Sequence, residues 1–141
     1  MPPRGADPAH MLAMAAHLQG RVHALNVTDG SRAVMRMSSV AACKLLIEAG
    51  AEPVLQLACR DRNRIALQAD LLGAHALGIR NLLCLTGDPV RSGDQPLARP
   101  VNEFESVKLL QQVEALNQGE DPVKGNLPDG ATALFAGCAA D

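Results

Sequence analysis

The sequence predicts an α/β fold in which helices cover a parallel sheet. Three observations lead to this fold class. Short apolar runs of strand length recur along the chain, segments with apolar residues at helical spacing alternate with them, and glycines stand where several of these helices should end. Strands that alternate with amphipathic helices form parallel sheets with the helices packed against them.

The first half of the chain contains two predicted helices and two predicted strands. Residues 8–19 are rich in Ala, Met and Leu and stop at Gly20, as a helix closed by a left-handed glycine does. Residues 22–29 alternate in polarity and end polar, which is typical of a short strand. An apolar stripe predicts a helix over residues 34–49, and the run PVLQLAC predicts a strand over residues 53–59.

The next helix and strand follow the same pattern. Residues 62–77 form a predicted helix, with Ile65, Leu72 and Ala76 on one apolar stripe. Gly78 and Ile79 then supply a glycine stop with a hydrophobic contact, and residues 81–86 (NLLCLT) predict a short, almost wholly apolar strand.

A long loop precedes the last predicted helix and strand. Residues 87–102 contain three prolines and two glycines, and long loops in compact domains are usually functional or flexible. Residues 103–117 carry apolar positions at helical spacing and predict a helix. After a polar, turn-rich segment over residues 119–130, the apolar residues 131–139 predict a fourth strand.

Composition argues against several classes of protein. The net charge is −2 with acidic and basic residues interspersed, and the chain has 2 aromatic residues, so we expect no nucleic-acid partner. No apolar run approaches a membrane span, and the first residues lack the apolar stretch of a secretory signal. We therefore expect a cytoplasmic protein without a membrane partner.

The cysteines predict reduced thiols and no metal site. Cys43, Cys59, Cys84 and Cys138 are spread singly, without the paired spacing of a zinc or redox motif. Three of them lie in apolar runs of strand type, where a small hydrophobic side chain packs well. We expect a core role for these three.

Polar residues follow each of the first three predicted strands, at the end of the sheet where parallel α/β proteins place their sites. Helix capping explains Asp29, Ser31 and Asp61 at least as well as a functional role does. The run from Arg60 to Asn63 can hold phosphate at a helix start, but a solvated charge pair is the better interpretation of it.

Asp88 is the strongest candidate for a functional carboxylate. It follows Gly87, which permits close approach of the backbone to a ligand, and it precedes Pro89 and the long loop, where a helix cap is not expected. A carboxylate in this position can meet a cation or accept a hydrogen bond from a heterocycle. The alternative is an Asp-Pro pair that only initiates a turn.

Several segments resemble the methylenetetrahydrofolate reductase family, and especially its bacterial members that are fused to a homocysteine methyltransferase. These segments are PPRGADP, NVTDG, RMSS, LACRDRNRIALQADLLGAHALGIRN and LCLTGDPVRSGDQP, and together they span essentially the whole chain. The resemblance implies a (β/α)8 TIM barrel that holds FAD at the carboxyl ends of its strands. It also implies hydride transfer from NADH or NADPH to the flavin and then to methylenetetrahydrofolate, giving 5-methyltetrahydrofolate for methionine biosynthesis.

The resemblance assigns roles to particular residues. Asp88 matches the family's aspartate between flavin and folate, where a carboxylate can tune the flavin and stabilise the cationic 5-iminium form of the substrate. The expected catalytic residue is therefore Asp88. The expected cofactor-binding residues are Thr28, Gln56, Leu57, Ala58, Thr86, Gly87, Asp88, Asn102 and Glu103.

The sequence also departs from the family pattern. The family's general-acid glutamate lies on a strand just before the Pro-Pro pair, and the sequence has Met1 at that place. A complete barrel has eight strands, of which four are predicted here. We therefore expect residues 1–141 to form a single incomplete barrel domain that lacks the first strand and the second half. Such a chain should have little activity alone and should need the rest of the barrel or a homo-oligomer.

Two alternatives to a reductase remain open at this stage. The first is a non-catalytic flavin-binding or interaction module derived from the half-barrel. The second is an open α/β sheet with an unrelated ligand, but such a sheet normally has a glycine-rich phosphate turn after its first strand, which residues 27–30 (VTDG) do not supply.

Overall fold

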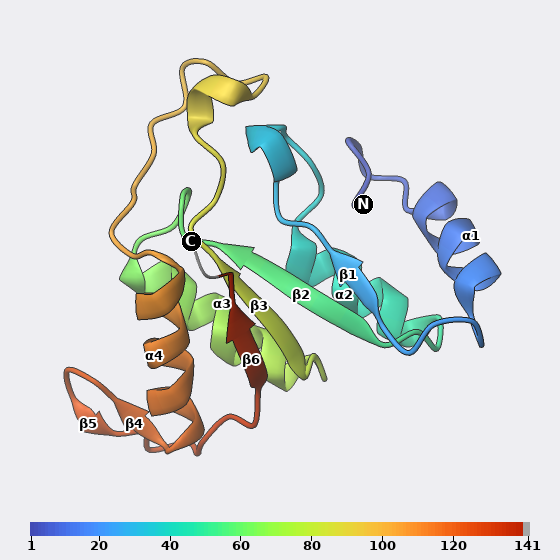
Figure 1. The fold of residues 1–141 in the computed structure, drawn as a ribbon. Helices are drawn as coiled ribbons and strands as arrows, with labels where there is room; N and C mark the ends of the chain where they lie inside the picture. The colour runs from blue at the N-terminus through green and yellow to red at the C-terminus, as the bar shows by residue number, and fades with distance from the viewer. Residues whose placement is uncertain (140–141) are drawn as a thin grey trace.

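A four-stranded parallel sheet in the order β1-β2-β3-β6 forms the centre of the computed structural model, which describes residues 1–139 (Figure 1). The strands are β1 (Leu25–Val27), β2 (Pro53–Ala58), β3 (Asn81–Leu85) and β6 (Phe135–Cys138). The helices are α1 (Ala9–Leu18), α2 (Ser39–Glu48), α3 (Arg64–Ala76) and α4 (Ser106–Asn117). Parallel strands that alternate with helices confirm the predicted fold class, part of a (β/α)8 barrel. Residues 140 and 141, which the predicted domain includes, lie outside the described residues.

The hydrophobic core lies between the sheet and the helices that cover one of its faces, with α2 and α3 behind the sheet in Figure 1. Along β2 the side chains alternate, because successive residues of a strand point to opposite faces. Leu55 and Leu57 are fully buried against the helices, whereas Val54 and Gln56 on the other face are half-buried.

The second face of the sheet carries a row of aligned side chains. The strand register aligns Asn26, Val54, Asn81 and Phe135 across the four strands. Phe135 is 80% exposed, although it is one of the largest apolar side chains of the chain. This face corresponds to the interior of a closed barrel, where inward side chains stack in layers.

Glycine stops end two of the helices in the way the sequence predicts. After α3, the amide of Gly78 donates to the carbonyl of His75 and the amide of Ile79 donates to the carbonyl of Ala74, at 3.1 and 3.0 Å. Gly78 has a φ of +91°, and Ile79 is fully buried. These two hydrogen bonds and the hydrophobic contact define a Schellman motif. The same two bonds recur after α2, around Gly50.

The predicted apolar stripe of α3 is wrong. Ile65 is 75% exposed, and Leu72 and Ala76 also face outward. The buried stripe consists of Leu67, Leu71 and Ala74. Apolar residues occur on more than one side of this helix, so periodicity alone did not decide which side faces the sheet.

Several predicted elements are shorter in the structure, and one hairpin was not predicted. The strand expected over residues 131–139 is limited to Phe135–Cys138, and the helix expected over residues 103–117 begins at Ser106. The strand expected over residues 22–29 is limited to Leu25–Val27, and the helix expected over residues 34–49 begins at Ser39. Within residues 119–130, β4 (Glu120–Asp121) and β5 (Gly125–Asn126) form an antiparallel hairpin. The Asp121 side chain stabilises its turn by accepting hydrogen bonds from two turn amides. Among residues 1–139, no helix is both long and apolar enough to cross a bilayer.

Candidate functional site

A cavity of about 370 Å³ lies at the carboxyl ends of β2, β3 and β6. Five residues predicted for the site lie on its wall, and they are Gln56, Ala58, Thr86, Gly87 and Asp88. Its other lining residues are Asp29, Ser31, Leu85, Ser106 and Ala139. The parallel sheet thus brings together side chains from connections that are far apart in the sequence.

A second cavity, of about 550 Å³, adjoins the first at the connection after β3. Thr86, Gly87 and Asp88 belong to both walls, and the long loop over residues 89–102 supplies most of the rest. Asn102, a predicted cofactor-binding residue, lines this second cavity. Its backbone is left-handed, with a φ of +46°. Asp88 therefore lines both cavities.

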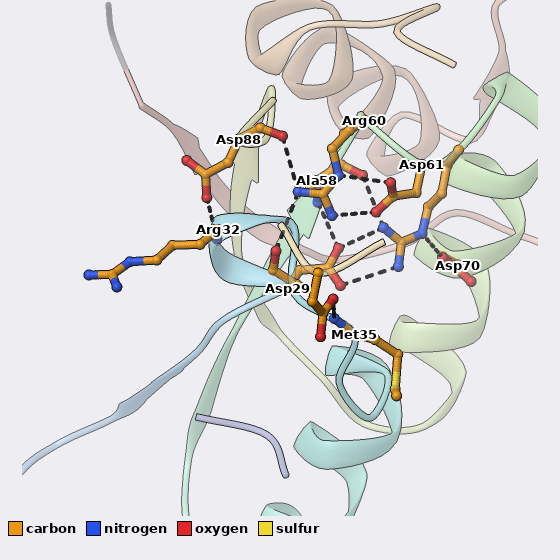
Figure 2. Close-up of polar contacts among 11 residues, drawn as sticks. Asp29, Arg32, Met35, Ala58, Arg60, Asp61, Asp70 and Asp88 are labelled. Atoms are coloured by element: carbon orange, nitrogen blue, oxygen red, sulfur yellow. Dashed lines mark hydrogen bonds and ion pairs between the residues drawn. The ribbon is translucent and has the colours of Figure 1, made fainter. Parts of the chain in front are cut away.

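The carboxylate of Asp88 is held by a hydrogen bond that comes from the connection after β1 (Figure 2). Its Oδ2 accepts from the backbone amide of Arg32 at 2.6 Å. Arg32 has a φ of +60°, a left-handed conformation that is unfavourable for a residue with a side chain. Asp88 thus stabilises a strained turn with one oxygen. Its second oxygen receives no hydrogen bond from residues 1–139, so it can accept one from a ligand in the cavity.

The backbone of Asp88 is held in turn by Arg60, which is 5% exposed. The guanidinium donates to both carboxylate oxygens of Asp61 and, at 3.3 Å each, to the carbonyls of Gly30 and Asp88. The hydrogen bond with Asp61 is the main reason that the pKa of Arg60 lies above its ordinary value. The interpretation of this run as a solvated charge pair is therefore wrong for Arg60.

Asp29 does not cap a helix but fixes the ends of β1 and β2 to each other. Its Oδ2 accepts hydrogen bonds from the amide of Ala58 at 2.9 Å and from Arg62 at 2.6 Å. Arg62 also donates to Asp70 at 2.7 Å. Burial lowers the pKa of Arg62, but the charges and hydrogen bonds of Asp29 and Asp70 outweigh it and keep the pKa above the ordinary value.

The cap of α3 is Asn63, and neither Asp29 nor Asp61 takes that role. The Asn63 side chain accepts from the amide of Ala66 at 3.0 Å. Asp61 is occupied by Arg60, and Ser31 lies on the cavity wall. Asp29 and Ser31 thus lie on the cavity wall. From the sequence alone, helix capping explained these two residues at least as well as a functional role did.

Gly87 is required by packing inside the protein. Its φ is +100°, and a Cβ added to it would lie 2.9 Å from the Cβ of Arg60 and 3.3 Å from that of Ala58. The close backbone approach expected from this glycine is thus made to the end of β2. Its carbonyl and amide edges still line both cavities.

Three predicted cofactor-binding residues lie on the wall of neither cavity. Leu57 is fully buried on the helix-covered face of the sheet. Glu103 accepts a hydrogen bond from the amide of Arg64 at 3.0 Å, beside the start of α3. Thr28 follows β1, and its hydroxyl is buried without a hydrogen-bond partner among the described residues. An unpaired buried hydroxyl of this kind fits a polar group of a ligand.

The donor and acceptor set fits a flavin better than a metal ion. The site offers a carboxylate oxygen, the Gln56 amide, hydroxyls and apolar surface from Ala58 and Leu85, which is the mixture typical of cofactor pockets. The two cavities fall within the size range of small-molecule sites. Within residues 1–139, no three His, Cys, Asp or Glu side chains gather as metal ligands would.

Sequence comparison gives one family. The family model described as methylenetetrahydrofolate reductase matches residues 1–131, which include every residue of the two cavity walls except Ala139. No curated protein matches the chain.

Proposed function

The chain belongs to the methylenetetrahydrofolate reductase family, and on that premise we propose that its cavity binds FAD and supports reduction of 5,10-methylenetetrahydrofolate. The nicotinamide donor is NADH or NADPH, and the product is 5-methyltetrahydrofolate. The observation that carries this proposal is the position of Asp88, which lines both cavities and whose second carboxylate oxygen receives no hydrogen bond from residues 1–139.

Several residues would hold the flavin. Gln56 presents a side-chain amide to the cavity, Thr86 and Gly87 present backbone groups, and Ala58 gives an apolar floor. The unpaired hydroxyl of Thr28 would find its partner in the cofactor. We propose contacts with its phosphate and ribityl portions for Asn102, Glu103 and the backbone of Leu57. A bound flavin would take hydride from the nicotinamide and deliver it to the folate.

Asp88 would act by electrostatics. The hydrogen bond from the Arg32 amide fixes the orientation of the carboxylate, so little reorganisation is needed when charge develops nearby. A negative charge there favours the cationic 5-iminium form of the folate. It also makes the flavin harder to reduce, because reduction brings further negative charge to the ring.

We propose further that residues 1–141 are one incomplete barrel domain. The uncovered sheet face with its exposed Phe135, and the free edges of β1 and β6, support this view. The remaining strands, including one that carries a general acid, would come from elsewhere, either from more of the same polypeptide or from another chain. The particular resemblance to family members that are fused to a homocysteine methyltransferase stays a prediction.

A binding experiment tests the cofactor proposal. The purified chain is titrated with FAD while flavin fluorescence and absorbance are recorded, and the same is done for Gln56→Leu and for the control Gln111→Leu. Gln56 lines the cavity, whereas Gln111 is exposed on α4. We expect saturable binding that Q56L weakens about tenfold, the effect of one good polar contact, and that Q111L leaves unchanged.

Addition of substrates then separates the reductase from a flavin-binding module. NADH or NADPH and methylenetetrahydrofolate are added in turn to the FAD complex under anaerobic conditions. Two results together support the reductase: the nicotinamide bleaches the flavin absorbance, and methylenetetrahydrofolate then restores it. Bound flavin that neither NADH nor NADPH bleaches indicates the non-catalytic module. Bleaching that methylenetetrahydrofolate does not reverse is expected if the general acid comes from a strand outside these residues. Absence of FAD binding contradicts the proposal that these residues form the flavin site.

A further inference from the structure

Arg60 occupies the point where the connections after three strands meet (Figure 2). Its guanidinium reaches Gly30 after β1, Asp61 after β2 and Asp88 after β3, and its own carbonyl accepts from the amide of Val101 at 2.8 Å. The long loop is therefore fixed at the same residue. The sequence indicated a charge pair within the run from Arg60 to Asn63, but not the hydrogen bonds of Arg60 with the connections after β1 and β3.

The contacts require an arginine. One edge of the guanidinium is saturated by the carboxylate of Asp61, whose own side chain is half exposed and faces the solvent. The remaining nitrogen donates to two backbone carbonyls that belong to different connections. A planar group with five fixed donors can serve these directions together, whereas a lysine ammonium is a single point of donation.

The space beside Arg60 is tight on two sides. A Cβ placed on Gly30 would lie 2.8 Å from its Nη2, and a Cβ placed on Gly87 would lie 2.9 Å from the Cβ of Arg60. The contact at Gly87 is with an atom attached directly to the backbone, so a side chain there has no room. These contacts restrict the positions that Arg60 can take beside the carbonyl of Asp88, although Arg60 also lines the second cavity.

We propose that Arg60 is a positioning residue for Asp88. It fixes the main chain at Asp88 against the end of β2, so that the carboxylate reaches the Arg32 amide with one oxygen and the cavity with the other. Arg60 is absent from the wall of the first cavity, so it acts there through Asp88. The expected effect of Arg60 on FAD binding rests on the proposed function of the cavity. Its effect on the position of Asp88 does not, because the hydrogen bond from the Arg32 amide can be measured without FAD.

Hydrogen exchange of the Arg32 amide tests this role in the 141-residue chain. Residue-resolved exchange is measured for the wild type, Arg60→Lys, Asp88→Ala, the double variant and the control Arg62→Lys. Arg62 is a half-buried arginine two positions away that contacts Asp29 and Asp70 but not Asp88. We expect R60K and D88A each to accelerate exchange at Arg32 about tenfold, as loss of one hydrogen bond does.

The double variant distinguishes positioning from general loosening. If Arg60 acts through Asp88, adding R60K to D88A changes the Arg32 exchange by less than about twofold, since coupled residues are not additive. R62K should accelerate hydrogen exchange at the amide of Ala58, which donates to Asp29. The exchange rate of the Arg32 amide in R62K should stay within about twofold of the wild-type rate. Multiplicative effects in the double variant, or equal acceleration of the β2 and β3 core amides, would overturn the proposal. Should R60K not fold, Arg60→Gln, which places no charge in the site, carries the same comparison.

FAD titration of the same variants keeps the two proposals separate. R60K should weaken FAD binding to the extent that D88A does. Wild-type chain that binds no FAD contradicts the proposed function, while the exchange data still decide the role of Arg60. Normal FAD binding with unchanged Arg32 exchange in R60K would overturn the positioning role alone.

Discussion

At the scale of single residues, Asp88 and Arg60 show how one side chain serves both the fold and the site. Asp88 holds the strained turn at Arg32 with one oxygen, and its other oxygen receives no hydrogen bond from the described residues. Arg60 joins the connections after three strands through backbone carbonyls. Substitution of either residue should therefore change local order as well as any ligand affinity.

The cysteines give a pH-dependent prediction. Burial raises the pKa of Cys43 and Cys84 to about 12 and that of Cys59 to about 11. These pKa values lie above the ordinary value, so the folded state keeps the thiols protonated as pH rises through 9, and the thiolate is the reactive form. We predict that at pH 9.5 a thiol reagent labels Cys138, which is half-buried, before the other three.

Mass spectrometry of the labelled protein checks this order. All four cysteines should react at similar rates in denaturant, which serves as the control. Rapid labelling of Cys43 or Cys84 in the native protein would contradict their burial.

The sequence predicted some of these residues for physical reasons and missed others. Asp88 and Thr86 were predictable because the carboxyl ends of parallel strands meet at one edge of a sheet, whereas Gln56 was assigned only through the family resemblance. The role of Arg60 was not, because a guanidinium that binds carbonyls of remote connections leaves no mark on spacing or periodicity. A buried arginine and an exposed one look alike in a run of charged residues.

At the scale of elements, α3 shows what periodicity can and cannot predict. Its end was predicted correctly, because a left-handed glycine followed by a buried isoleucine is a local signal. Its buried stripe was assigned to the wrong side, because that choice depends on where the sheet lies. The hairpin of β4 and β5 was missed for a related reason, since strands of two residues carry no alternation.

Two substitutions in α3 test the observed stripe. Leu71 is fully buried, so Leu71→Ala should lower the free energy of unfolding by about 2–5 kcal/mol. Ile65 is 75% exposed, so Ile65→Ala should change it by less than about 0.5 kcal/mol. Urea unfolding followed by circular dichroism measures both. Equal losses would contradict the observed stripe, and a larger loss for I65A than for L71A would mean that the helix buries the stripe first predicted from the sequence.

At the scale of the whole molecule, the parallel sheet determines where chemistry can occur. All four strands point their carboxyl ends to one side, and both cavities that contain Asp88 open there. The fold class followed from the alternation of strands and helices. How the sheet closes could not follow from the sequence, because closure depends on pairing at the free edges of β1 and β6, which local patterns do not describe.

The central claim is that the Asp88 carboxylate faces a bound flavin, and the reduction potential of FAD bound to the chain tests it most directly. The potential is compared for the wild type, Asp88→Asn and the control Asp129→Asn, which lies in an exposed turn before the amino end of β6. Removal of a charge near the ring should raise the potential of D88N by roughly 30–70 mV. D129N should leave it unchanged. An equal potential in D88N and wild type would contradict the account.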